Sequence, residues 1–482
     1  MYYTNTNNEF YWASELKSII NSIPAKPSIC KTGLNLFFRL TYIPAPNTIY
    51  EGVFKLEPNH FISYDLKTNT IDIEKIHDDK ALEKSNLSFN DAKKEVNKRI
   101  FESVESRSIS DVPIGTFLSG GVDSSVVTYC LAEMTDAKID TFSIGFEKKS
   151  YDETDKSKVV AKMVNSNHHE FIINENDLKK HTHDILMNFD EPFADSSSLP
   201  TYLVSAKTKQ HVKVALTGDG GDEVFGGYNK YYIGKINTKY TKIVPKSVHN
   251  TISKLSGKLL HQKDDSRGIK YKLSKLINAI DYSNNYYWDI ISLGLNVNDI
   301  ESLLIPEFQQ TSIFDYYKTK SKITNPKSLN DFRTIDRHLS LEGDMLVKVD
   351  RTSMLNSLEC RSPFLNRELF NFTMSLPEDY LLKNWSKKHI LKEAFTDAFP
   401  KGFLEKSKQG FGVPVGDWLR EGLKKELQSY IEVPLLKSQG IFNIPEIQKL
   451  VRNHILGKAD NTFKVWSFFC FQKWYINSYI NS

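Results

Sequence analysis

The sequence lacks the features that mark several large classes of protein. It has only four cysteines in 482 residues, Cys30, Cys130, Cys360 and Cys470, and none forms the C-x-x-C pair that holds zinc or an iron–sulfur cluster. No apolar run approaches the roughly 18 residues of a membrane-spanning helix. The first residues are also too polar for a secretory signal. Membrane proteins and disulfide-rich secreted proteins are thereby excluded, and we expect a cytoplasmic protein with reduced thiols.

An excess of charge of one sign is also lacking. The chain has 63 Lys and Arg residues against 59 Asp and Glu residues, a net charge of +4, and the two signs are interspersed without a basic block. Such a balance gives little support for binding nucleic acid, and we expect no nucleic-acid or membrane partner. With 40% hydrophobic and 25% charged residues, the composition is that of a soluble globular protein of two or three domains.

The first eighty or so residues are predicted to be rich in β-structure. Residues 61–66 and 70–74 alternate apolar and polar side chains on either side of a turn at residues 67–69, which predicts a β-hairpin. A short helix is expected near residues 13–17. Because so few elements cannot bury an independent core, we interpret residues 1–85 as part of a domain and residues 86–482 as a second, complete one.

From residue 88 the pattern changes to alternating helices and strands. Ala92, Val96, Ile100 and Val104 are spaced to share one face of a helix. Strands are predicted at 113–118, 140–146, 169–173 and 212–216, with helices at 125–134, 155–164, 182–187 and 202–209. This alternation predicts an α/β fold with a parallel sheet covered on both faces. The chain after residue 231 is predicted to be mostly helical, and the aromatic run at 465–475 to be a buried terminal helix.

The segment Ser119-Gly120-Gly121-Val122-Asp123-Ser124-Ser125 lies between a predicted buried strand and a helix. Glycines let backbone N–H groups face an anion, and the serine hydroxyls and the helix N-terminus add further donors. A carboxylate in such a cradle is suited to phosphate only when a divalent cation stands between them. The lysine of a Walker A loop is absent, so an ordinary γ-phosphate NTPase is not predicted. Taken alone, the segment could equally be a turn with a capping aspartate.

A second polar loop follows the fourth predicted strand, at residues 212–216. Residues 216–228 contain three acids, Asp219, Asp222 and Glu223, together with five glycines. Neighbouring carboxylates repel one another unless a cation joins them. Because both loops follow parallel strands, they are expected at the carboxyl edge of the sheet, where such sheets bind ligands. The pair of loops therefore favours a functional site over two surface turns.

With both loops in view, the sequence resembles the ATP-pyrophosphatase (PP-loop, adenine nucleotide alpha hydrolase-like) superfamily and, within it, the glutamine-hydrolysing asparagine synthetases. The similarity extends through residues 151–153, 190–197, 350–354, 358–365 and 406–411. The resemblance implies a PP-loop parallel sheet with flanking helices and a helical C-terminal part. It also implies that the β-rich start is the remnant of an N-terminal-nucleophile glutaminase domain.

The resemblance implies an ATP-dependent amide ligase. The β-carboxylate of aspartate would attack the α-phosphorus of ATP, and ammonia would displace AMP from β-aspartyl-AMP to give asparagine. Mg²⁺ would be bound by Asp123 and Asp222, and the catalytic residues would be Lys408 and Asp219, which stands where many members have Glu. ATP would be held by the residues of the two loops and the adjoining strands: Leu118, Ser119, Gly120, Gly121, Asp123, Ser124, Ser125, Ile144, Thr217 and Gly218.

The resemblance also bears on the nitrogen source. Glutaminase domains of this family have a cysteine directly after the initiator methionine, whereas this sequence has Tyr2, and residues 13–17 and 43–53 resemble only the last third of that domain. Free ammonia is therefore the expected nitrogen donor, with a separate glutaminase chain and a second copy in a homodimer as candidate partners. Two alternatives stay open: adenylation of another carboxylate, such as a sugar acid or a peptide, and a catalytically silent remnant.

Overall fold

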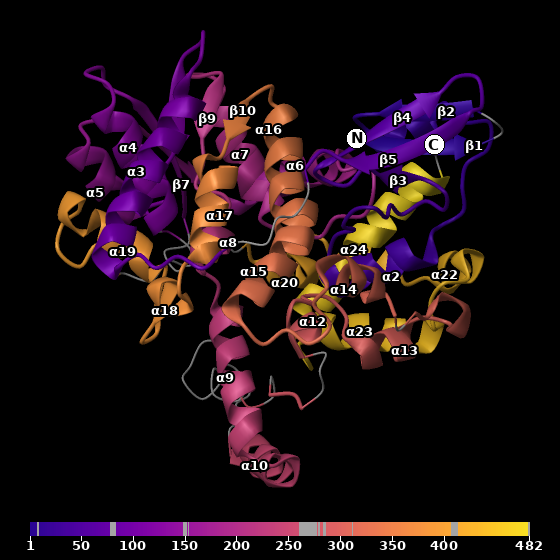
Figure 1. The fold of residues 1–482 in the computed structure, drawn as a ribbon. Coiled ribbons are helices and arrows are strands. Elements are labelled where there is room, and N and C mark those ends of the chain that lie inside the picture. The colour runs from indigo at the N-terminus through magenta and orange to yellow at the C-terminus, as the bar shows by residue number, and fades with distance from the viewer. Residues whose placement is uncertain are drawn as a thin grey trace.

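A five-stranded parallel sheet forms the centre of the largest part of the molecule (Figure 1). The computed structural model describes residues 1–482 except 7–8, 78–82, 148–151, 153, 260–276, 278–279, 283–285, 311, 406–412 and 481–482. The spatial order of the strands is β10-β9-β6-β7-β8. Their bounds are β6 Ile114–Phe117, β7 Asp140–Phe146, β8 Asn167–Ile173, β9 Val214–Leu216 and β10 Glu359–Arg361. The predicted parallel sheet is confirmed, and β10 is an edge strand that the sequence did not reveal.

The strand order creates a reversal point at the middle of the sheet. From β6 the chain continues to β7 and β8 on one side, and then returns to β9 on the other side of β6. Thr116 of β6 is paired with both Thr141 of β7 and Leu216 of β9. The loops after β6 and β9 therefore leave the same edge as neighbours on either side of the reversal, where open α/β sheets bind ligands.

Helices pack on this sheet as the alternating sequence pattern predicts. α4 contacts β6, α5 contacts β7 and β8, and α7 and α16 contact β7 and β10 respectively. The predicted apolar face of α3 is confirmed, because Ala92, Val96, Ile100 and Val104 are all buried. The bounds of these helices are α3 Phe89–Ser108, α4 Val122–Glu133, α5 Thr154–Met163, α6 Glu175–Met187, α7 Ser198–Thr208 and α16 Val347–Met354.

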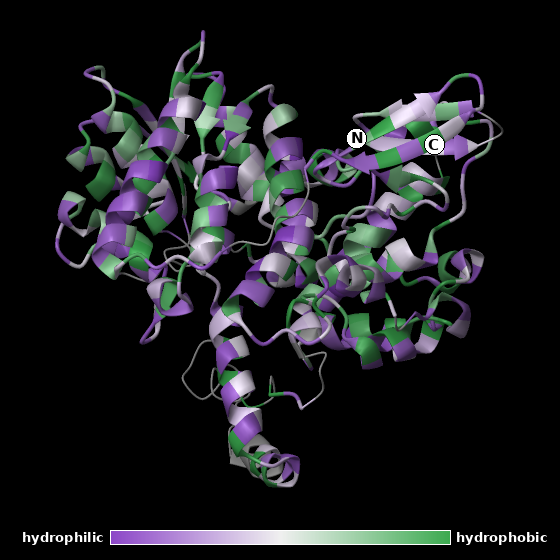
Figure 2. Ribbon diagram, in the orientation of Figure 1, coloured by the Kyte–Doolittle hydropathy of each residue, from purple (hydrophilic) through white to green (hydrophobic). Residues whose placement is uncertain are grey.

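The N-terminal region forms two small sheets and two helices. The antiparallel sheet β2-β1-β3 comprises Tyr2–Thr6 (β1), Glu9–Ala13 (β2) and Phe54–Lys55 (β3), and the predicted hairpin is confirmed as β4 His60–Asp65 with β5 Thr70–Lys75. α1 spans Leu16–Ile20 and α2 spans Lys31–Leu40. Figure 2 shows hydrophobic positions, in green, among hydrophilic ones on these strands. Exposed apolar side chains include Trp12, Phe54, Phe61, Leu66 and Ile73.

The C-terminal half is mainly helical, as predicted. Its elements after the sheet loops are α8 Gly221–Phe225, α9 Asn229–Ile243, α10 Lys246–Leu259, α12 Tyr286–Ile290, α13 Val297–Leu303, α14 Asp315–Ser321, α15 Leu329–Asp336, the π-helical segment η2 Arg337–Leu346, α17 Arg367–Ser375 and α18 Glu378–Leu381. The hairpin β11 Leu382–Lys383 and β12 Ser386–Lys387 leads into α19 His389–Phe395. The last helices are α20 Val415–Arg420, α21 Lys424–Ser429, α22 Val433–Gln439, α23 Ile444–Ile455 and α24 Thr462–Trp474. Within the described residues, none of these helices is long and apolar enough to cross a membrane.

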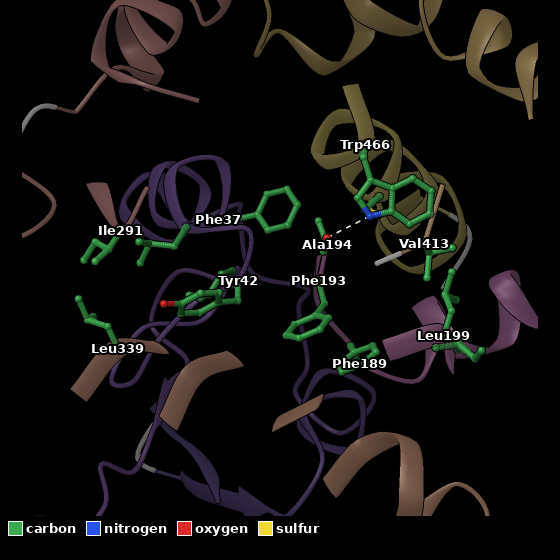
Figure 3. Packing of buried hydrophobic residues seen from close by; sticks show 14 of the residues in the cluster. Phe37, Tyr42, Phe189, Phe193, Ala194, Leu199, Ile291, Leu339, Val413 and Trp466 are labelled. Atoms are coloured by element: carbon green, nitrogen blue, oxygen red, sulfur yellow. Dashed lines mark hydrogen bonds between the residues drawn. The ribbon is translucent and has the colours of Figure 1, made fainter. Parts of the chain in front are cut away.

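The C-terminal helix α24 packs against the N-terminal region of the chain. The prediction that this helix is buried is confirmed. Its residues from Val465 to Trp474 are buried, and it contacts the N-terminal helix α2. The Phe38 ring of α2 lies 5.4 Å from that of Phe471. In Figure 3, Trp466 donates a hydrogen bond from Nε1 to the Ala194 carbonyl at 3.0 Å, close to Phe193 and Phe37. The core thus runs continuously from the N-terminal region into the helical part.

Candidate active site

The loop after β6 is shaped as an anion cradle. Gly120 has φ +71°, and a Cβ added there would lie 2.5 Å from Lys156 Cβ and 2.8 Å from the Ser157 nitrogen, both in α5. Only glycine can therefore both adopt this backbone conformation and fit the space available at this position. Gly121 precedes the first residue of α4, so the unpaired N–H groups and positive dipole end of this helix face the loop.

The serines of this loop are divided between scaffold and available donor. The Ser119 nitrogen donates to Ser124 Oγ at 3.2 Å, and the two hydroxyls lie 2.9 Å apart, so this pair fixes the turn. The hydroxyl of Ser125 is buried and has no hydrogen-bond partner within the described part of the chain. A buried hydroxyl is costly to leave unpaired, so Ser125 is a donor that a ligand at the start of α4 could use.

The loop after β9 closes directly onto the first loop. A Cβ added to Gly218 would lie 2.8 Å from the Ser124 nitrogen, and one added to Gly221 would lie 2.6 Å from Asp123 Cγ. Thr217, which is buried, donates its N–H to the Arg361 carbonyl of β10 at 2.8 Å. The two loops that the sequence separates by about ninety residues are therefore in van der Waals contact.

Asp123 and Asp222 converge on one lysine that sequence reasoning missed. Lys388 Nζ lies 2.5 Å from Asp123 Oδ2 and 2.7 Å from Asp222 Oδ1. Burial alone would lower the pKa of Lys388, but the two carboxylates outweigh it and hold this pKa above its ordinary value. The lysine therefore stays charged, and the two carboxylates share it as a cation.

The backbone holds Lys388 in an uncommon conformation. It follows the β11–β12 hairpin, immediately precedes α19, and has φ 54° and ψ 37°, a left-handed conformation that costs a non-glycine residue roughly 1–2 kcal/mol. Gly227 closely approaches this side chain, because a Cβ added to Gly227 would lie 2.1 Å from Lys388 Cε. Strain of this kind persists where the surrounding structure fixes a functional side chain.

The same pair of carboxylates fits a Mg²⁺ ion that also binds phosphate. Within the described residues, no group of three or more His, Cys, Asp or Glu side chains is arranged to hold a metal ion by itself. Two carboxylates plus substrate phosphate oxygens and water are, however, the usual ligands of Mg²⁺ in nucleotide sites. Asp123 and Asp222 thus meet the requirement only together with a bound phosphate.

A buried arginine secures the second loop from behind. Arg333 of α15 donates from Nε to the Glu223 carbonyl at 2.8 Å and from Nη2 to Thr373 Oγ1 at 2.7 Å. The bond to Glu223 supplies a donor to a backbone carbonyl of the short helix α8, which begins at Gly221. Burial, and secondly the charge of Asp222, raises the pKa of Glu223 to about 7, while Tyr228 donates to its Oε1 at 2.7 Å.

The remaining predicted site residues lie along the same edge, with one exception. Leu118, directly after β6, and Ile144, on the neighbouring strand β7, are both buried. Asp219 is half-buried, and its carbonyl accepts a hydrogen bond from Ser362 Oγ just after β10. Lys408 lies outside the described residues. An ion pair joins Glu359 and Arg361 at 2.7 Å on β10.

Comparison with known sequences agrees with this geometry. A sequence model of the family described as asparagine synthase matches residues 95–476. A second, described as a glutamine amidotransferase domain, matches residues 1–75.

Individual relatives carry the same description. Asparagine synthetase [glutamine-hydrolyzing] 1 of Bacillus subtilis is 28% identical over 98% of this chain and 73% of its own length. A putative asparagine synthetase of Mycobacterium bovis is 27% identical over 96% of this chain and 70% of its own. Putative asparagine synthetase 2 of Methanocaldococcus jannaschii is 35% identical over 73% of this chain and 67% of its own.

Proposed function

The chain belongs to the asparagine synthase family of carbon–nitrogen ligases, and we propose that it activates aspartate with ATP and converts β-aspartyl-AMP with ammonia to asparagine, AMP and pyrophosphate. The observation that carries the proposal is the convergence of Asp123 and Asp222 on Lys388 between two glycine loops at the reversal point of the sheet. This arrangement offers one buried ammonium, backbone donors and two magnesium-type carboxylates at one place. Binding of a nucleoside triphosphate draws on all three of these features.

The chemistry would proceed by positioning and charge neutralisation. The donors around Ser119, Gly121 and Ser125 would hold the β- and γ-phosphates, so that the substrate carboxylate oxygen attacks the α-phosphorus and pyrophosphate leaves. Mg²⁺, held by Asp123 and Asp222, would supply neutralisation of the pyrophosphate charge. Lys388 would add a fixed positive charge beside the leaving group.

The acyl-adenylate then requires stabilisation while ammonia attacks its carbonyl carbon. Asp219, which is half-buried in the second loop, is proposed to accept the proton that the attacking ammonia loses. Lys408 is proposed to stabilise the negative charge of the transition state. Leu118 and Ile144, together with Thr217 and Gly218, would line the adenosine side.

We expect free ammonia to serve as the nitrogen donor for this chain. Glutamine hydrolysis of the family's type needs a reactive thiolate. Burial raises the pKa of Cys30 to about 11 and that of Cys360 to about 12, and it raises the pKa values of Cys130 and Cys470 well beyond the ordinary range. None of the four thiols is therefore prepared for nucleophilic attack at neutral pH.

Three further assignments accompany the proposal. The protein would act in the cytoplasm, where ATP is available. A separate glutaminase chain is the proposed source of ammonia, and its contact would cover apolar side chains such as Trp12 and Leu66, which are 66% and 84% exposed. Association of two copies in a homodimer is a second use for such a surface.

The proposal is tested by ATP–pyrophosphate exchange with a panel of acids. With Mg²⁺ present, we expect exchange that depends on L-aspartate and not on a sugar acid or a peptide carboxylate. Exchange supported by another acid and not by aspartate would keep the adenylating site but reject aspartate as substrate. Absence of exchange and of AMP with every acid would indicate a silent scaffold.

A further inference from the structure

Two helices that project from the body of the molecule form a basic arm, residues 229–259. α9 follows the second glycine loop, and α10 lies at its far end (Figure 1). Of the chain's net charge of +4, this arm alone contributes +7 and contains no acid, so the remainder of the chain carries −3. Its seven lysines are Lys230, Lys235, Lys239, Lys242, Lys246, Lys254 and Lys258. The two signs of charge are interspersed over the chain as a whole, but not in this arm.

The corner between α9 and α10 is held by aromatic contacts. The buried His249 ring packs edge-on against Tyr240 at a centroid distance of 5.6 Å, and its Nδ1 lies 3.3 Å from the Tyr240 hydroxyl. Tyr282 donates its hydroxyl to the Val244 carbonyl at 2.7 Å. α10 is therefore fixed relative to α9 and is presented at the end of the arm.

The lysines of the arm differ between its base and its tip. Near the base, Lys230 Nζ lies 2.8 Å from Asp336 Oδ1, and Lys235 Nζ lies 3.2 Å from Glu378 Oε2. The lysines toward the tip are exposed and form no ion pair with any described residue: Lys239, Lys242 and Lys246. Like charges three or four residues apart weaken a helix, so folding alone does not account for these tip lysines.

Apolar side chains are exposed among the tip lysines. Ile243 at the end of α9 is 80% exposed, and Val248 and Ile252 of α10 are 48% and 39% exposed. Val248 and Ile252 are one helical turn apart, and the sequence continues this spacing with leucines at 255 and 259. Figure 2 shows hydrophobic and hydrophilic positions along both helices. α10 therefore has the pattern of a basic amphipathic helix, which is typical of helices that lie on a membrane surface.

A bilayer that contains anionic lipid would complement both features of the tip. Its headgroups would neutralise the lysines, and the exposed isoleucines would enter the boundary between headgroups and acyl chains. A nucleic acid would also neutralise the lysines, but its phosphate backbone offers no apolar surface and would leave Ile243 and Ile252 in water. The apolar side chains of the tip therefore favour lipid over nucleic acid.

We propose that the basic arm binds the surface of membranes that contain anionic lipid, with α10 lying in the headgroup region. The expectation of no membrane partner rested on the charge balance of the whole chain and not on this arm. At about 1.5 Å per residue, the 15 residues of α9 separate α10 from the glycine loops by roughly 22 Å. The proposed active site would therefore stay open to its substrates on the bound protein, and the inference does not depend on the proposed function.

Co-sedimentation of the full chain with phospholipid vesicles tests the proposal. We expect binding to phosphatidylcholine vesicles that contain phosphatidylserine, no binding to phosphatidylcholine alone, and weaker binding as salt is raised. Each lysine beside an anionic bilayer raises affinity roughly fivefold, so K239Q, K242Q and K246Q combined should weaken binding about 10- to 100-fold. Ile243→Ser with Ile252→Ser should also weaken binding, at low and at high salt alike, because it removes apolar burial.

A matched variant separates the arm from net charge. Lys425, Lys437 and Lys458 are exposed elsewhere in the C-terminal part, and replacing all three by Gln removes the same charge. This control should bind anionic vesicles within about twofold of the wild type, and both triple variants should keep its melting temperature. The proposal is overturned if neither kind of vesicle is bound, if the two triple variants lose binding equally, or if the arm's lysines bind labelled single-stranded RNA in place of vesicles.

Discussion

At the scale of single residues, the site depends on a lysine placed between two carboxylates. Replacing Lys388 by Ala would leave Asp123 and Asp222 repelling each other and would remove the fixed charge beside pyrophosphate. We expect Lys388→Ala to lower ATP–pyrophosphate exchange by roughly 100-fold or more, with the loss in kcat exceeding that in aspartate binding.

The neighbouring lysine is a matched control for this variant. Lys387 lies on the same hairpin, but its ammonium donates to Asn229 Oδ1 at 2.8 Å and acts on the two carboxylates only through longer-range charge. Lys387→Ala should keep exchange within about threefold of the wild type. Equal activity of the two alanine variants would contradict the role given to Lys388.

Thiol reactivity provides a second prediction at this scale. Because the pKa of Cys30 is raised to about 11, only on the order of one part in a thousand is thiolate at pH 8. Alkylation of the native protein by iodoacetamide should therefore be slow at pH 8 and rise about tenfold per pH unit toward pH 10. Mass spectrometry of the modified peptides would check this. A cysteine that reacts at pH 7 as fast as a free thiol would contradict it.

The two polar loops could be located from the sequence, because each carries a local pattern, whereas Lys388 could not. Ser119 to Ser125 are contiguous and carry their own loop-and-helix pattern, so their position at the start of α4 could be predicted, while their role in binding phosphate stays a prediction. Lys388 is 265 positions from Asp123, and nothing local distinguishes it from Lys387 beside it. Only the tertiary fold brings it to the two carboxylates.

At the scale of elements, the strand–loop–helix unit β6–α4 depends on a glycine for two separate reasons. Gly120 has a left-handed backbone and no room for a Cβ against α5, whereas Gly402 has φ +75° and no atom within 4 Å of an added Cβ. Gly402→Ala should therefore cost only about 1 kcal/mol of strain. Gly120→Ala should cost about that plus 1–3 kcal/mol for the clash, and weaken ATP binding.

Thermal unfolding and nucleotide titration of the two variants would measure these costs. Because Gly120 and Gly402 both have a positive φ, the difference between the two variants measures the steric clash at Gly120. If both variants unfolded at the same temperature and bound ATP alike, the tight packing of the first loop against α5 would be refuted.

The elements that could be predicted are those in which apolar residues recur with a regular spacing along the chain. β6, β7 and β8 each contain apolar residues and alternate with helical segments, and α3 has apolar residues spaced along one helical face. β10 is only three residues long and pairs with β9 across a large sequence distance, so it carries no such pattern. The helix α2 was not predicted from the sequence, and its residues from Gly33 to Leu40 are all buried, including the polar Asn35 and Arg39.

At the scale of the whole molecule, a buried ion pair connects the N-terminal region to the synthetase part. Lys55 Nζ contacts Glu191 and donates to the Ile43 carbonyl, and Glu191 Oε2 accepts from the Ile49 nitrogen at 3.2 Å. The division at residue 85 stays a prediction, but the two parts share this buried contact and the core around α24. Removing one partner of such a pair leaves an uncompensated buried charge.

A double-mutant cycle tests this connection. Lys55→Met should destabilise the protein by about 3–5 kcal/mol, and Lys55→Met with Glu191→Leu should cost less than Lys55→Met alone. Lys98→Met removes an exposed pair, with side chains 66% and 58% exposed, and should change stability by less than about 1 kcal/mol. Denaturation midpoints in urea provide the comparison. A K55M variant as stable as K98M would show that the pair does not hold the two parts together.

The account's central claim is that this chain adenylates a substrate carboxylate and then forms an amide. The most direct measurement uses aspartate labelled with ¹⁸O in its β-carboxylate, incubated with ATP, Mg²⁺ and ammonium, followed by mass spectrometry of the nucleotide. Attack on the α-phosphorus transfers one carboxylate oxygen to the phosphoryl group. We predict AMP carrying one ¹⁸O, formed in equal amount to pyrophosphate and asparagine. Unlabelled AMP, or ADP with phosphate as the products, would contradict the account.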